Sequence, residues 1–251
     1  MNVLVCRPTK DAKDLSEKLQ KNGVAAVCLP TIKIKLINVE INLEAYTSII
    51  FTSKYAVESL FNSIPVKSLK GKKIYSVGAS TAAYLEKYEI DAIYPAKYNS
   101  KALVQLIQRN NISKERFLVV SGVSGNDLLV TELSKQTICK KLEVYERVFE
   151  DEQFLATEYK NLFSDAEPDV IITTSLDVFK SLNRILEKTQ LSEQAIITIT
   201  SSKMLEFVNK EGFKNTLKLE RLNNNYICKQ ILELIEAKDV DRKKHSTTRK
   251  S

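Results

Sequence analysis

The sequence predicts an α/β protein built from two similar lobes, each a parallel sheet covered by helices. Three observations lead to this prediction. Short β-rich runs alternate with amphipathic segments, the alternation occurs twice, and two segments depart from it as half-exposed strands. A chain of 251 residues with 43% apolar residues is long enough to bury two ordinary cores.

The alternation runs along the whole chain. Strands are expected at VLVC, SIIF and KIYSV in the first half and at FLVV, DVIIT and AIITI in the second. The amphipathic segments between and after them are DAKDLSEKLQKNG, KYAVESLF, STAAYLEKY, KALVQLI, DLLVTELS, LDVFKSLNRIL, SKMLEFVNKEG and YICKQILELI. Strands alternating with helices of this length are typical of parallel sheets with helices on their faces.

The two halves also correspond in register. Leu4, Leu15 and Leu19 match Leu118, Leu129 and Leu133 at an offset of 114 residues, and Thr52, Ser53, Ile74 and Glu89 match Thr174, Ser175, Ile196 and Glu211 at an offset of 122. This agreement predicts an internal duplication.

Two segments do not fit the alternation. TIKIKLI (residues 31–37) and KLEVYERV, within 141–149, alternate apolar and polar residues at period 2, as half-exposed antiparallel strands do. If they pair as linker strands, one lobe is discontinuous, with residues 1–30 and 150–237, and the other spans residues 38–140. A cleft is expected between the lobes.

The net charge of +7 is unevenly distributed. From Lys238 onward there are six Lys or Arg against two Asp, so this end carries +4 and the rest of the chain +3. We expect residues 238–251 to form a disordered basic tail. Nucleic-acid binding by that tail is a rival interpretation, but the body has no stripe of basic residues with interleaved aromatics, so no nucleic-acid partner is expected.

Composition also limits the chemistry and the compartment. The only histidine, His245, lies in the basic tail, which excludes Ser-His-Asp and Cys-His arrangements in the folded body. No apolar run approaches the roughly 20 residues of a membrane helix, so we expect a cytoplasmic protein without a membrane partner. The four cysteines lack a CxxC pair and are expected to be buried free thiols: Cys6, Cys28, Cys139 and Cys228.

Hydroxyl side chains cluster after the predicted strands. They occur in the segments Thr52–Ser53, Gly78–Thr81, Ser121–Gly125, Thr174–Ser175 and Thr200–Ser202. Helix capping explains any one of them. In open α/β sheets, however, ligands bind outside the carboxyl ends of the strands, where helix N-termini favour anions. Five such segments on two lobes favour a shared anionic ligand.

Other chemical templates do not fit. The chain has no phosphate-binding GxxxxGK[ST] loop, and VGAST and SGVSG are too poor in glycine for a dinucleotide site. Tyr145 lies on one of the half-exposed strands. It is either an amphipathic residue of that strand or a phenol able to donate a proton without carrying a charge. A cofactor-independent activity or simple binding remains.

Longer pieces occur in a fixed order along the chain: VLVCRPTKDAKDLSEKLQKNG leading to LPTIKI, then IIFTSKYAVESLF, YSVGASTAAYLEKY, SGVSGNDLL, VYERV and IITTSLDVFKSL. In order and spacing they resemble the uroporphyrinogen-III synthase (HemD) family from Val3 to about Ile235. The resemblance implies two flavodoxin-like lobes joined by a two-stranded antiparallel ribbon. It also implies no cofactor, no metal and a monomeric state.

The resemblance further implies the reaction. Its substrate is hydroxymethylbilane, a flexible linear tetrapyrrole polycarboxylate. The chain would close this substrate to uroporphyrinogen III, with loss of water and inversion of ring D through a spiro-pyrrolenine, in heme and siroheme biosynthesis. Such a cyclising lyase is expected to make transient contact with hydroxymethylbilane synthase. The rival interpretation is a non-catalytic two-lobed protein that binds an anionic small molecule.

Site residues follow from the same resemblance, position by position. Substrate contacts are expected at Thr52, Ser53, Ser76, Val77, Gly78, Thr81, Ser121, Gly122, Thr174 and Ser175, and Tyr145 is the candidate general acid. The chain departs from the family at Ser121 and near Asn126, where arginines are common. Thr200 stands where the first half has Gly78, which puts binding by the Thr200–Ser202 segment in doubt. Arg7 either binds or anchors a neighbouring element.

Overall fold

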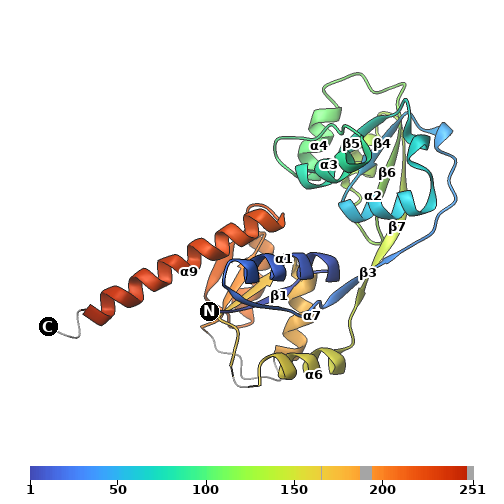
Figure 1. The fold of residues 1–251 in the computed structure, drawn as a ribbon. Helices are drawn as coiled ribbons and strands as arrows, with labels where there is room; N and C mark the ends of the chain where they lie inside the picture. The colour runs from blue at the N-terminus through green and yellow to red at the C-terminus, as the bar shows by residue number, and fades with distance from the viewer. Residues whose placement is uncertain (165, 187–193, 248–251) are drawn as a thin grey trace. The chain divides into compact units, whose positions relative to one another are not determined.

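The computed structural model describes residues 1–164, 166–186 and 194–247, with side chains described up to Lys238. The chain divides into two compact units: unit 1 comprises Met1–Lys33 with Val148–Ser251, and unit 2 comprises Ile34–Arg147. Each unit holds its own sheet, and each is described separately below (Figure 1).

Unit 1 contains sheet A, with the strand order β10-β9-β8-β1-β2. Its strands pair in parallel where their registers are described. In chain order its elements are β1 (Asn2–Cys6), α1 (Thr9–Lys21), β2 (Ala25–Cys28), α6 (Glu152–Leu162), β8 (Val170–Thr173), α7 (Leu176–Leu186), β9 (Ile196–Ile199), α8 (Ser202–Lys210), β10 (Thr216–Lys218) and α9 (Asn224–Thr247).

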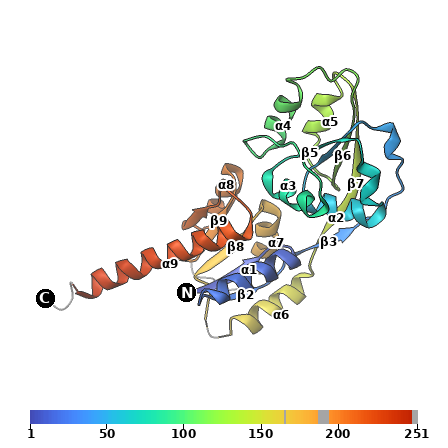
Figure 2. The same ribbon diagram turned by 45° about the horizontal axis from the view of Figure 1, so that its top comes forward.

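Helices cover both faces of sheet A. On one face Leu4 and Ile171 pack with side chains of α6, α7 and α8. On the other face Val3 and Val170 pack with α1 and α9 (Figure 2). Strands buried on both faces need apolar residues at nearly every position, and VLVC and VIIT meet that need.

Unit 2 contains sheet B, with the strand order β3-β7-β6-β4-β5. Its elements are β3 (Ile32–Leu36, which begins in unit 1), β4 (Ser48–Phe51), α2 (Lys54–Ser63), β5 (Lys73–Ser76), α3 (Ala79–Leu85), α4 (Ser100–Ile107), β6 (Arg116–Gly122), α5 (Leu128–Leu133) and β7 (Ile138–Phe149), with short 3-10 helices at Leu43–Ala45, Val66–Leu69 and Glu86–Tyr88.

Sheet B is also covered on both faces. Ile49 and Phe51 of β4 point toward α2 and α3, and Ile50 of the same strand points toward α4 and α5. The helices after neighbouring strands therefore lie on opposite faces: α2 follows β4 on one face, and α5 follows β6 on the other. This divergence marks the topological switch point of the sheet, between the carboxyl ends of β4 and β6.

The two sheets share a strand order. The run β9-β8-β1-β2 of sheet A corresponds to β5-β4-β6-β7 of sheet B, in the pairs indicated by the sequence offsets of 122 and 114. β10, which pairs with β9 at the end of sheet A, also has a counterpart in sheet B. There Ile93 forms a parallel bridge with Tyr75 of β5. The α/β prediction with two similar parallel-sheet lobes is confirmed by this arrangement.

The two segments with period 2 form β3 and much of β7. The N–H of Ile37 donates to the carbonyl of Val144 (2.7 Å) and that of Glu150 donates to Thr31 (3.1 Å), so the strands run antiparallel. β7 also pairs in parallel with β6 through residues 138–145, so both β3 and β7 are strands of sheet B. The sequence predicted residues 31–37 and 141–149 as linker strands only. The unit boundaries fall inside both strands. Their role as a joining ribbon stays a prediction.

The C-terminal helix extends further than the sequence suggested. α9 continues to Thr247, so the expected disorder from residue 238 does not hold for residues 238–247, while residues 248–251 lie outside the described part of the chain. The segment 224–247 has no glycine or proline, and adding residues to a helix already anchored by packing at Ile227 and Ile231 costs little. Among the described residues, no helix is both long and apolar enough to cross a membrane.

Candidate functional site

The switch point of sheet B gathers most of the predicted site residues. Thr52 and Ser53 follow β4, the Ser76–Thr81 segment ends β5 and opens α3, and Ser121 and Gly122 end β6. Tyr145 joins them from β7, because it pairs in register with Gly122. Parallel strands end at one edge of the sheet, so all these residues of unit 2 lie on that edge.

Tyr145 is held from two sides. Its hydroxyl receives a hydrogen bond from the Ser53 hydroxyl at 3.0 Å, and its ring packs against Tyr55 with centroids 5.8 Å apart. Only 3% of Tyr145 is exposed. Tyr145 is therefore buried and not half-exposed on its strand, and its role as a proton donor stays a prediction.

Ser53 connects Tyr145 to helix α2. It is the N-cap of that helix, and its oxygen accepts the N–H of Ala56 at 3.2 Å. The same hydroxyl donates its proton to Tyr145, so a helix N–H, a serine and a tyrosine form one ordered series. In this arrangement the Tyr145 hydroxyl accepts from Ser53 and keeps its own proton for another acceptor. Hydrogen bonds in such a series polarise one another in the same direction.

Gly122 makes room for the tyrosine ring. A Cβ atom built at Gly122 would lie 2.6 Å from Cζ of Tyr145 and 3.0 Å from its hydroxyl oxygen. Such separations are far inside van der Waals contact, so a side chain at this position and Tyr145 in its place are incompatible. A register shift between Ser121 and Gly122 marks the same point as a bulge.

The loop after Gly122 is fixed by its own chain. Ser124 has a positive φ of 55°, and its N–H donates to the carboxylate of Glu143 at 3.1 Å. Lys141 bonds the carbonyl of Gly125 at 3.1 Å and pairs with Asp127 at 2.8 Å. Hydrogen bonds to the carboxylates of Asp127 and Glu143 raise the pKa of Lys141, so its ammonium group stays charged. A cation thus reaches the loop from β7, although Ser121 and Asn126 replace the expected arginines.

The loop after β5 is shaped by Gly78 and Tyr98. The buried Ser76 hydroxyl donates to the carbonyl of Gly78 at 3.1 Å, and Thr81 is a buried residue of α3. A Cβ built at Gly78 would lie 3.0 Å from Cβ of Tyr98, so the ring of Tyr98 borders this loop. Val77 continues the sheet by donating its N–H to Phe51 at 3.1 Å.

Two hydroxyls of the edge are used internally. Thr52 bonds the carbonyl of Val120 through both its N–H and its hydroxyl, each at 3.1 Å. Ser121 is buried and its hydroxyl donates to the carbonyl of Gly122 at 3.3 Å. These side chains shape the edge from inside. The structure shows their hydroxyl protons bonded within the unit, and substrate contact at these two residues stays a prediction.

The remaining predicted residues lie in unit 1, at the carboxyl end of β8. Ser175 accepts the N–H of Val178 at 3.3 Å, as an N-cap does, and Thr174 precedes it at partial exposure. In the following loop Ser201 caps α8, and the hydroxyl of Thr200 lies 3.7 Å from the sulfur of Met204. Capping accounts for both serines of this unit.

Arg7 follows β1 at the switch point of sheet A. It is 6% exposed, and its guanidinium bonds the carbonyl of Leu222 at 2.9 Å, the side chain of Asn224 and, at 3.6 Å, Asp11. Arg7 therefore anchors the start of α9 and the first turn of α1. The structure favours the anchoring interpretation of this residue.

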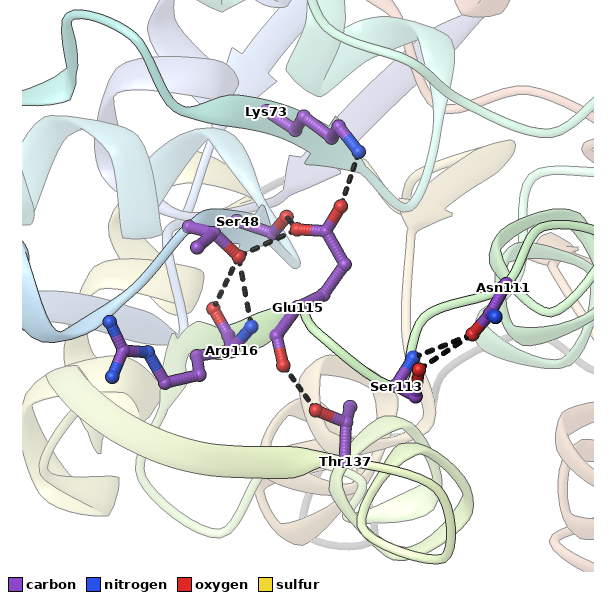
Figure 3. A network of polar contacts seen from close by, with 8 residues as sticks. Ser48, Lys73, Asn111, Ser113, Glu115, Arg116 and Thr137 are labelled. Atoms are coloured by element: carbon purple, nitrogen blue, oxygen red, sulfur yellow. Dashed lines mark hydrogen bonds and ion pairs between the residues drawn. The ribbon is translucent and has the colours of Figure 1, made fainter.

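The opposite edge of sheet B carries a separate polar network (Figure 3). Glu115 accepts hydrogen bonds from Thr47 at 2.6 Å, from Ser48 at 3.0 Å and from Lys73. Burial by itself raises the pKa of Glu115, but the bonds from Lys73 and the two hydroxyls outweigh it, so the net shift is downward. Partners at the starts of two strands, β4 and β5, surround this carboxylate, so the network is a structural clasp.

The cysteines are ordinary free thiols. Cys6 and Cys228 are buried as expected, whereas Cys28 and Cys139 are only partly buried. Burial raises the pKa of Cys139 to about 11 and also raises that of Cys6. Thiols with raised pKa values are poor nucleophiles at neutral pH.

Sequence reasoning missed three contacts at the site: the bond from Ser53 to Tyr145, the fit of Tyr145 over Gly122, and the position of Tyr98 beside Gly78. The first two join residues far apart in sequence, and no local pattern reveals such pairs. Tyr98 carried a weak signal, since a loop that places an aromatic side chain among polar residues is unusual.

These features define a class: a protein of two related α/β units, in which the strand ends of one unit surround a buried tyrosine bonded to a helix-capping serine. The sequence profile of the family described as uroporphyrinogen-III synthase HemD matches residues 13–222. The chain therefore belongs to the uroporphyrinogen-III synthase family.

Individual relatives agree with the family match. The uroporphyrinogen-III synthase of Chlorobaculum parvum is 26% identical over 251 residues, covering 93% of this chain and 99% of the relative. A putative uroporphyrinogen-III synthase of Methanocaldococcus jannaschii is 30% identical over 140 residues, covering 53% of this chain and 58% of that relative. The second match thus spans less than two thirds of that relative's length.

Solved structures share the fold. The uroporphyrinogen-III synthetase of Helicobacter pylori superposes with a TM-score of 0.65 at 16% identity, covering 93% of this chain and 99% of the other. A mutant uroporphyrinogen III synthase of Thermus thermophilus gives a TM-score of 0.56 at 12% identity, covering 94% and 100%.

Proposed function

We propose that this chain closes hydroxymethylbilane to uroporphyrinogen III, as a cyclising hydro-lyase that uses no cofactor. The observation that carries the proposal is the family match over residues 13–222, which includes the predicted site residues of both units. The arrangement around Tyr145 supports it, because loss of a hydroxyl as water needs a proton donor and the sequence of unit 2 contains no histidine.

Tyr145 is the proposed donor for the first step. The C–O bond of the hydroxymethyl group breaks with its electron pair on oxygen, the phenol proton joins that oxygen, and water leaves. The pyrrole nitrogen supplies electrons to the carbon left behind, which gives a cationic azafulvene. The phenolate that remains is stabilised by the proton of Ser53, which is itself polarised by the N–H of Ala56.

The later steps need shape control. The substituted carbon of ring D attacks the azafulvene carbon and forms a spiro-pyrrolenine, which fragments and closes again with ring D inverted. The proton released when the macrocycle regains its aromatic rings returns to the Tyr145 phenolate, so the donor is restored. Because the same bilane closes without inversion in water, the protein must hold one fold of the substrate.

Substrate contacts are proposed at the strand ends of both units, from Thr52, Ser53, Ser76, Val77, Gly78, Thr81, Ser121 and Gly122 in unit 2 and from Thr174 and Ser175 in unit 1. Backbone N–H groups and hydroxyls suit a polycarboxylate whose rings must still move, since they bind anions without fixing them as firmly as cations do. The proposal includes a cytoplasmic monomer and transient contact with hydroxymethylbilane synthase.

An isomer assay tests the proposal. Fresh hydroxymethylbilane is supplied to the purified chain, the products are oxidised, and the uroporphyrin isomers are separated against a reaction without protein. The type III isomer should predominate with the protein present. If only type I accumulates, as it does without enzyme, the proposal fails. Tight binding of the bilane without product would then indicate the non-catalytic binding protein.

A further inference from the structure

A pair of exposed tyrosines borders the site in unit 2. Tyr94 and Tyr98 lie on the segment between the bridge at Ile93 and helix α4, with ring centroids 6.2 Å apart. Tyr94 is 43% exposed and Tyr98 is 49% exposed, so nearly half of each residue is open to solvent. Large aromatic side chains are normally covered, and an exposed pair of them usually marks a binding surface.

Tyr98 of this pair packs against Gly78, which belongs to the candidate site. Cβ of Tyr98 lies against Gly78 so closely that a Cβ there would be only 3.0 Å away. Gly78 belongs to the loop at the carboxyl end of β5, next to the loop of Thr52 and Ser53 on β4. The tyrosine pair therefore continues the edge of sheet B at which the predicted residues gather.

The charge around the pair is positive. Lys97 precedes Tyr98, Lys101 lies in the first turn of α4, and residues 92–114 contain no Asp or Glu. In the part of the chain that the structure describes, neither lysine forms an ion pair. An aromatic surface with adjacent unneutralised cations is complementary to an aromatic ring that carries carboxylates.

We propose that Tyr94 and Tyr98, with Lys97 and Lys101, form a subsite for one carboxylate-bearing pyrrole ring of the substrate. This inference rests on the proposed function and extends it by naming residues that bind a ring and not only its acids. The rings supply a stacking face, while the lysines hold the acid side chains of the same pyrrole. A subsite that fixes one terminal ring lowers the number of conformations open to the rest of the bilane.

Kinetics of paired variants test the subsite. Tyr98→Leu should raise KM for hydroxymethylbilane about three- to tenfold with little change in kcat, the size expected for one aromatic pair. Tyr98→Phe, which keeps the ring and removes only the hydroxyl, should raise KM less than Tyr98→Leu does. Ile138→Ala, which removes an equally exposed side chain at the opposite end of sheet B, should change nothing. Lys97→Gln with Lys101→Gln should raise KM and weaken its dependence on salt.

A binding measurement separates this inference from the proposed function. The chain has no tryptophan, so Tyr98→Trp and, as control, Ile138→Trp each introduce a single reporter. Uroporphyrinogen III, kept reduced so that it does not absorb the emission, should quench the reporter at position 98 and not at 138. If the wild type makes type III product while Tyr98→Leu keeps its KM and position 98 is not quenched, the subsite is overturned. If the wild type makes no type III product, the proposed function fails instead.

Discussion

The switch points of the two sheets differ although their strand orders agree. In unit 2 the edge between β4 and β6 presents Ser53, Gly122 and a buried tyrosine. In unit 1 the equivalent edge between β8 and β1 presents Ser175 and Arg7, and the arginine is bonded to Asp11 and to the start of α9. With the same strand order, the edge in unit 2 therefore carries small and polar residues around a tyrosine. The edge in unit 1 carries an arginine that is bonded to other elements of unit 1.

This difference assigns the two units different tasks. The offset of 114 that relates β1 to β6 places Pro8 opposite Gly122 and Thr31 opposite Tyr145, so unit 1 has neither the glycine nor the tyrosine of this contact. The proton donor is therefore proposed for unit 2 alone, with unit 1 supplying contacts. The predictions below test this division, from the largest expected effect to the smallest.

Replacing Gly122 by alanine should have the largest effect. The new Cβ would lie 2.6 Å from the Tyr145 ring, so the ring must leave its place. A displacement of about 1 Å at a reacting group can lower a rate about 100-fold, and we expect a loss of kcat of at least that order for type III formation. Gly78→Ala, whose Cβ meets Tyr98 at 3.0 Å, should cost clearly less. Equal losses would argue against a special role for Gly122.

Replacing Tyr145 by phenylalanine should lower kcat about 10- to 100-fold and leave KM nearly unchanged, because the ring stays in place and only the donor is lost. Steady-state kinetics with isomer analysis measures this effect. Unchanged turnover would remove Tyr145 from the chemistry and leave shape control to the rest of the edge.

The clasp around Glu115 should matter for stability and not for turnover. Glu115→Gln removes the charge that three donors share, and we expect a loss of about 1–2 kcal/mol in the free energy of unfolding at neutral pH. Denaturant titration measures it. A change in kcat above about twofold would show that the two edges of sheet B are not independent.

The pH dependence of this variant has a definite sign. Because the pKa of Glu115 is lowered in the folded state, its contribution is fully present above the ordinary carboxyl pKa of about 4.3 and is lost as the pH falls through the lowered folded value. The difference in stability between wild type and Glu115→Gln should therefore shrink below pH 4.3. A difference that stays constant in acid would contradict the assigned partners.

The capping serines offer a matched comparison between the units. Ser53→Ala and Ser175→Ala each remove an N-cap, and each should lower stability by about 1 kcal/mol. Only Ser53→Ala should also lower kcat several-fold, since only Ser53 donates to Tyr145. Thermal denaturation and turnover of both variants decide the matter, and similar losses of kcat in the two would argue for equal roles.

The smallest effect is expected at Thr200. Thr200→Gly restores the residue type of Gly78 in the equivalent loop of unit 1. It should change kcat and KM less than about twofold and lower stability by about 0.5–1 kcal/mol through added backbone freedom. A marked gain in affinity would mean that the threonine side chain keeps substrate from that loop.

Much of the fold could be predicted because it depends on local pattern. The strand VLVC is apolar throughout, SIIF begins with its only polar residue and VIIT ends with its only polar residue, so their burial can be predicted directly. Helix α6 was missed, although Asp151 caps it and Leu155 and Tyr159 lie one turn apart on its buried face. Its apolar content is low, so the period was hard to see beside the half-exposed strand that precedes it.

The sequence could place the candidate residues at the ends of neighbouring strands, but it could not predict the contacts of their side chains. Strand order brings the ends of β4, β5, β6 and β7 to one edge, and hydroxyl residues after strands can be located without a structure. What no pattern revealed is which hydroxyls face inward. Ser76 and Ser121 have the same type as Ser53, yet their bonds go to neighbouring carbonyls, because the sheet covers them.

The way unit 2 is inserted into unit 1 sets an order for folding during synthesis. Unit 2 is one continuous stretch and can complete its sheet as soon as its own residues have emerged from the ribosome. Strand β1 of unit 1 must wait for the central strand β8, its partner more than 160 residues later in the chain. Folding of unit 2 lowers the entropic cost of pairing β1 with β8, because most of the chain between these two strands is already ordered when β8 is made.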